Sequence, residues 1–133
     1  MQRSIKILII LFLLIGCNSN DGKAADLELN NGAKWQVNTE MKSYILRGDE
    51  ILSTYLSGKS KNYRALAEEL KNQNISLIKS CNMKGKSHDE LHKWLIPHME
   101  LVEQLLNAND LNEAETLVFQ LEDSYNTYHI YFE

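Results

Sequence analysis

The chain has 133 residues, of which 44% are hydrophobic and 24% are charged, and its formal net charge is −4 at pH 7. This length is enough for one modest hydrophobic core. Lysine and arginine form no basic stripe with interleaved aromatic residues, so the composition argues against nucleic acid as a partner.

The amino-terminal segment carries the clearest functional signal. Two basic residues precede an apolar run over residues 7–15, and the run ends in Leu-Ile-Gly-Cys at positions 14–17. A transmembrane helix needs about 20 apolar residues, so this run is too short to span a bilayer. The segment resembles the lipobox signal peptide of bacterial lipoproteins. The resemblance implies that residues 1–16 are removed and that Cys17 receives a diacylglyceryl group.

A lipidated Cys17 would hold the protein on a bacterial membrane with its domain outside the cytoplasm, in the cell envelope. Two acyl chains are sufficient for stable attachment. Removal of Arg3 and Lys6 with the signal peptide changes the net charge from −4 to −6, so we expect membrane contact through the acyl chains alone. Residues 17–36 are polar and rich in Asn, Gly and Asp, which predicts a flexible tether.

Residues 37–133 show four helical patterns with short breaks, each with apolar residues three or four positions apart. The first pattern begins near Thr39, whose side chain is predicted to cap it, and ends at Gly58. The second runs from about Lys61 to Cys81. Trp35 precedes the first helix and is expected to fold over one end of the domain.

The third and fourth patterns begin with capping signals. Ser87 followed by Glu90 predicts a capping box, and Asp110 followed by Glu113 repeats it. Pro97 lies inside the third pattern, where proline removes a backbone hydrogen bond. The helix therefore either bends at Pro97 or restarts there.

Four amphipathic helices with short loops predict an all-α fold, an up-down-up-down four-helix bundle. In this topology, the first and third helices begin at the pole where the second and fourth end. Six side chains suited to soft metals are predicted to gather near this pole. They are Met41 and the five proposed metal ligands Cys81, Met83, His88, His92 and His129.

The histidine spacing favours a metal site. His88 and His92 are four residues apart, so both project from one side of the third helix. Thiolate, thioether and imidazole ligands together favour copper(I), or zinc if Cys81 and the histidines dominate. The alternative is that these side chains only cap and pack the end of the bundle.

The turn before the third helix and the helix itself carry a further resemblance. Their pattern is similar to one in small, uncharacterised helical bacterial lipoproteins and comprises Cys81, Met83, Gly85, His88, Leu91, His92, Trp94, Leu95 and Pro97. The resemblance implies no particular activity.

Two other classes of function are alternatives to metal binding. Met41 and His129 occupy places similar to the heme ligands of four-helix b-type cytochromes, so a b-type heme bundle is an alternative. A noncatalytic module that binds an envelope protein is another, with Trp35 and the carboxy-terminal aromatic residues as its candidates. No identifiable group orients Cys81 or a histidine for nucleophilic chemistry, so we do not expect an enzyme.

Overall fold

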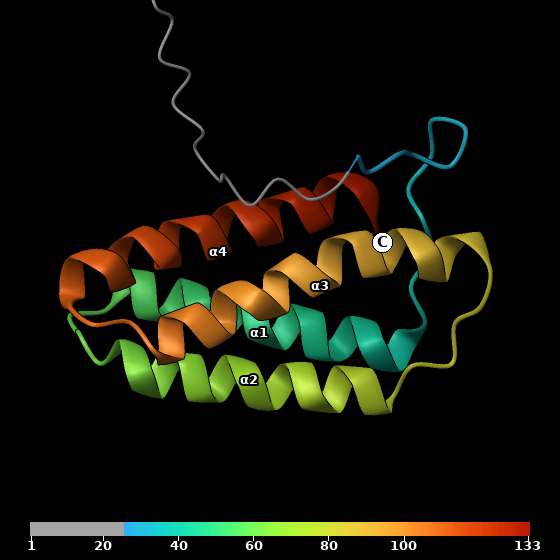
Figure 1. Ribbon diagram of the computed structural model, residues 1–133. Helices are drawn as coiled ribbons and strands as arrows, with labels where there is room; N and C mark the ends of the chain where they lie inside the picture. The colour runs from blue at the N-terminus through green and yellow to red at the C-terminus, as the bar shows by residue number, and fades with distance from the viewer. Residues whose placement is uncertain (1–25) are drawn as a thin grey trace, which may run out of the picture.

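The structure, a computed structural model, describes residues 26–133, so the predicted signal peptide and the predicted lipidation site at Cys17 lie outside the described residues. Successive helices of the bundle run antiparallel, and Figure 1 shows each lying beside the next in the chain. The helices are α1 (Thr39–Ser57), α2 (Tyr63–Lys79), α3 (Lys86–Leu106) and α4 (Leu111–Tyr131). The predicted all-α four-helix bundle is therefore confirmed. Within residues 26–133, no helix combines the length and apolarity needed to cross a membrane.

The core lies along the axis of the bundle, where each helix contributes one apolar stripe. Helix α4 also contacts α1, which closes the bundle. At this contact a Cβ atom on Gly48 would collide with the hydroxyl of Tyr125, so glycine lets the two helices approach. The largest fully buried apolar side chains are Trp94, Tyr128, Phe132, Met41, Ile45, Leu52, Leu70, Leu77, Leu91, Leu105 and Leu121.

Two of the predicted helix starts are wrong in detail. Helix α1 has Asn38 rather than Thr39 as its N-cap, and the Asn38 side chain donates to the carbonyl of Ser80 instead of capping. Helix α3 follows Gly85, whose φ of 70° favours glycine, and no side chain caps it. The predicted Ser87 capping box does not form, because Ser87 lies inside the helix and the Glu90 carboxylate makes other hydrogen bonds.

The predicted start of α4 is confirmed. The Asp110 side chain accepts a hydrogen bond from the Glu113 amide at 2.9 Å, and the Glu113 carboxylate accepts one from the Asn109 amide. Pro97 lies inside α3 without ending it. Helix α3 therefore continues through Pro97 and does not restart there.

Residues 26–37, here called the strap, lie against the start of α3 and the end of α4, so residues 26–36 are held on the bundle and do not form part of the predicted flexible tether. The Trp35 amide donates to the Tyr131 carbonyl, and the amides of Val37 and Glu133 complete a short parallel ladder. The Trp35 ring is only 6% exposed, and its Nε1 donates to the Glu28 carbonyl at 2.6 Å. Trp35 therefore covers one end of the bundle as predicted.

Glu90 holds the start of the strap on α3. Its Oε2 accepts a hydrogen bond from the Glu28 amide at 3.2 Å, and its Oε1 accepts one from Lys93 Nζ at 2.6 Å. The same ammonium group donates to the Asp26 carbonyl at 3.3 Å. Burial opposes ionisation of Glu90, but the bonds from Lys93 and Glu28 hold its pKa below the usual range.

We expect Glu90→Ala to lower the free energy of unfolding by about 1–2 kcal/mol, because it leaves the Glu28 amide without its acceptor and removes one of the two acceptors of Lys93. Urea denaturation followed by circular dichroism measures this loss. Glu100→Ala is the matched control, since Glu100 is an exposed glutamate on the same helix. An equal loss in both variants would contradict a stabilising contact between Glu90 and the strap.

Candidate functional site

His88 and His92 form a pair on the first two turns of α3. Their ring centroids are 4.2 Å apart, and the ring planes are inclined by 44°. The His88 side chain is 31% exposed, its Nδ1 lies 3.6 Å from Asp89 Oδ1, and His92 is exposed. At 3.6 Å this contact is too long for a hydrogen bond. The two imidazoles are therefore close to each other and open to solvent.

The two sulfur side chains lie on the segment between α2 and α3. Cys81 is a free, partly buried cysteine, and its amide donates to the Ile78 carbonyl at the end of α2. Both Cys81 and Met83 pack against the hydrophobic core. Among residues 26–133, no three side chains of the His, Cys, Asp or Glu type are grouped so that they could hold a metal ion. The structure thus pairs His88 with His92 without adding a third ligand of these types.

His129 lies near the end of α4, and its side chain contacts α1. Its Nε2 is 2.7 Å from Asp49 Oδ2 on α1, and both side chains are partly exposed. The Met41 side chain, by contrast, is only 1% exposed. The two residues weighed as heme ligands are therefore a core methionine and a histidine paired with a carboxylate.

Four of the aromatic residues considered for partner binding are buried and so are not available to a partner, whereas Tyr131 is partly buried. Trp35, Tyr125, Tyr128 and Phe132 are each no more than 6% exposed. Tyr125, Tyr128 and Phe132 pack around Trp94 in the core, with ring centroids 5.0–6.5 Å from it. The most exposed large apolar side chains lie elsewhere and are Phe119, Ile130, Ile96, Ile78, Leu46 and Ile75.

His98 is the one histidine inside the core, as its place on the apolar face of α3 predicts. Its ring stacks on Trp94 with a centroid separation of 4.8 Å, and its Nδ1 is 2.9 Å from Ser124 Oγ. Its Nε2 has no hydrogen-bond partner among the described residues. Burial lowers the pKa of His98 to about 3, so the ring is neutral at physiological pH.

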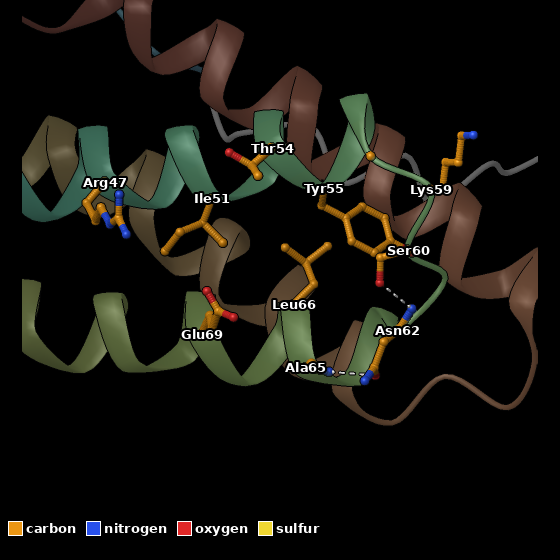
Figure 2. Close-up of a pocket in the computed structure, with 11 residues that line it drawn as sticks. Arg47, Ile51, Thr54, Tyr55, Lys59, Ser60, Asn62, Ala65, Leu66 and Glu69 are labelled. Carbon is orange, nitrogen blue, oxygen red and sulfur yellow. Dashed lines mark hydrogen bonds between the residues drawn. The ribbon is translucent and has the colours of Figure 1, made fainter.

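An open groove of about 390 Å³ lies between the end of α1 and the start of α2. Figure 2 shows Ile51 and Leu66 facing each other across it. Several of its polar groups already have partners, because Asn62 caps the Ala65 amide and Arg47 pairs with Glu50. The groove lies at the pole away from His88 and His92. Its lining is Arg47, Ile51, Thr54, Tyr55, Gly58, Lys59, Ser60, Asn62, Ala65, Leu66 and Glu69.

The sequence reasoning missed two features of these surfaces. It assigned Glu90 to a helix cap, whereas Glu90 joins the strap to α3. It also missed the exposed isoleucines beside the histidine pair, although Ile96 follows His92 at a spacing of four, which places both on one side of a helix.

In comparisons with known proteins, the chain matches no protein-family model, no curated protein and no solved structure. The site must therefore be interpreted from its own geometry.

Proposed function

We propose that this protein is a noncatalytic, lipid-anchored protein of the bacterial cell envelope that binds a copper or zinc ion at the His88–His92 pair. The proposed anchor is a diacylglyceryl group on Cys17, supported by the lipobox-like sequence at positions 14–17. The domain would then lie outside the cytoplasm. The observation that carries the metal proposal is the 4.2 Å separation of the two imidazole rings.

The chemistry of the pair supports a transition metal rather than a hard cation. Imidazole nitrogen suits zinc and copper, whereas calcium and magnesium prefer oxygen ligands. Two histidines one helical turn apart can bind one ion together, because both project from the same side of the helix. Cys81 and Met83 lie on the preceding segment and would favour copper(I) if they joined the site.

A metal titration tests the proposal. The full chain, purified in detergent under reducing conditions, is titrated with Zn²⁺ or Cu⁺ while Tm is followed by circular dichroism. A ligand that binds only the folded state stabilises it by about 2.7 kcal/mol at 100 times its Kd. We therefore expect Tm to rise with the ion in the wild type and to stay constant in His88→Ala and His92→Ala.

His129→Ala is the matched control for this titration, because it removes a histidine paired with Asp49 on another side of the bundle. Its Tm should rise with the metal as in the wild type. A wild-type Tm that responds to neither ion would refute the metal proposal. Cys81→Ala and Met83→Ala then show whether the copper(I) response needs either sulfur atom.

A second candidate is an envelope interaction module without metal. Its support is the outer side of α4, where Phe119 and Ile130 are 61% and 58% exposed. Helix α4 contains no lysine or arginine, so this surface has no positive charge of its own apart from what protonated His129 would add. A wild-type Tm that is unchanged by either ion would favour this candidate.

A further inference from the structure

One copy of the chain supplies too few ligands for a protein zinc site. Zinc in stable protein sites is almost always four-coordinate. The His88–His92 pair provides two nitrogens, and within residues 26–133 no third His, Cys, Asp or Glu completes a group. Both sulfur side chains on the neighbouring segment pack against the core. If the proposed metal binding holds, two positions on the ion remain for ligands from another molecule.

Exposed isoleucines continue from the pair along the side shared by α2 and α3, beside charged residues such as Asp89. His88, His92 and Ile96 follow one another at a spacing of four, so they form one stripe along α3. The Ile96 side chain is 54% exposed. Because Ile96 is this exposed and lies next to the open histidine pair, another molecule can cover both.

Helix α2 extends the apolar surface. An ion pair of 2.7 Å between Lys71 and Glu103 shows which turns of α2 and α3 lie side by side. Because the two helices are antiparallel, this register places Ile78 level with Ile96 and Ile75 one turn further along. Ile78 and Ile75 are 47% and 41% exposed. We call this surface, made of His88, His92, Ile96, Ile78 and Ile75, the His–Ile face.

We propose that two copies of this chain share one zinc ion, each contributing His88 and His92, with their His–Ile faces packed together. A twofold axis through the ion would supply four imidazole nitrogens from two identical pairs. The same axis would place the isoleucines of one copy against those of the other. The inference rests on the proposed metal binding at the histidine pair.

The size and charge of the face explain why the ion is needed. Stable protein interfaces bury about 1,200–2,000 Å² in total, which five partly exposed side chains per copy do not provide. Each chain is acidic, with a formal net charge of −4, so two copies repel each other weakly. The zinc–imidazole bonds compensate for the small contact area, and the positive charge of the ion offsets the repulsion between the two acidic chains. Without zinc, the chain should therefore be a monomer.

The test combines molar mass with zinc stoichiometry. The mass of the full chain in detergent is measured by light scattering with the detergent contribution subtracted, first in EDTA and then with Zn²⁺. Bound zinc is counted by isothermal titration calorimetry. We expect a monomer in EDTA, a dimer with Zn²⁺, and one ion for every two chains. His92→Ala should abolish the dimer, and His129→Ala should leave it unchanged.

A second pair of variants tests the apolar contact separately from the ligands. Ile96→Glu should weaken zinc-dependent dimerisation at least tenfold. Phe119→Glu is the matched control, since Phe119 is an exposed apolar residue on α4, away from the His–Ile face, and it should dimerise as the wild type does. If Ile96→Glu dimerises as tightly as Phe119→Glu, the proposed packing of the two faces is overturned.

The stoichiometry separates failure of this inference from failure of the metal proposal. One zinc ion bound per monomer would overturn the shared site and leave metal binding intact. A dimer that persists in EDTA would also overturn it, because the ion would not be the link. No zinc uptake at all would overturn both proposals.

Discussion

Trp94→Ala is expected to lower the free energy of unfolding by about 3–5 kcal/mol, the usual cost of deleting a fully buried aromatic side chain. Trp94 is 1% exposed, and its ring contacts His98 and Tyr128 with centroid separations of 4.8 and 5.0 Å. Its Nε1 also donates to the Ser124 carbonyl at 2.8 Å. The variant therefore removes core packing and a hydrogen bond joining α3 to α4.

Urea denaturation followed by circular dichroism measures this loss, since the backbone signal does not depend on which tryptophan remains. Ile96→Ala is the matched control, because Ile96 lies on the same helix but is 54% exposed. Its loss should be within about 0.5 kcal/mol, as for most surface substitutions. A loss below about 1 kcal/mol in Trp94→Ala would contradict a core centred on this ring.

The fold follows from the sequence because the apolar spacing repeats throughout all four helices. Local signals were sufficient where the partners are close in sequence, as with Asp110 and Glu113 at the start of α4. Trp35 was also placed correctly, since a large apolar residue next to a helix end has few other places to be buried. These predictions required only helical periodicity and the side-chain chemistry of single residues.

Predictions were less successful where a long-range contact decides what a side chain binds. Glu90 follows Ser87 with capping spacing, yet its carboxylate binds the Glu28 amide 62 residues earlier in the chain. His129 was assigned to the metal cluster because α4 ends at the same pole. Its direction depends on how α4 is rotated about its axis, and that rotation brings it to Asp49. Helical spacing within α3, by contrast, fixed the pairing of His88 with His92.

Burial of the carboxy-terminal aromatic residues also follows from helical spacing. Tyr125 and Tyr128 follow Leu121 at positions four and seven further along the chain, which places them on the inner face of α4. In the folded chain they surround Trp94, and Tyr128 stacks on Phe132 at 5.4 Å. The most exposed apolar residues are instead Phe119 and several isoleucines, three of which belong to the His–Ile face.

The buried His98 makes the stability of the bundle depend on pH. An unfolded histidine has a pKa near 6.5, whereas burial lowers the pKa of folded His98 to about 3. Between these two values the unfolded state binds a proton that the folded state does not. As the pH decreases from above 6.5, protonation of His98 in the unfolded state lowers the free energy of unfolding. Below pH 3 this residue lowers it no further.

We expect His98 to cost the wild type roughly 1.5 kcal/mol of unfolding free energy between pH 6.5 and pH 5, since the slope approaches about 1.4 kcal/mol per pH unit. His98→Gln should lack this contribution while keeping a side-chain amide near Ser124. Urea denaturation of both proteins at several pH values measures the difference, and the other three histidines are common to both. Parallel pH profiles would show that His98 titrates alike in the folded and unfolded states, which its complete burial and its single bond to Ser124 argue against.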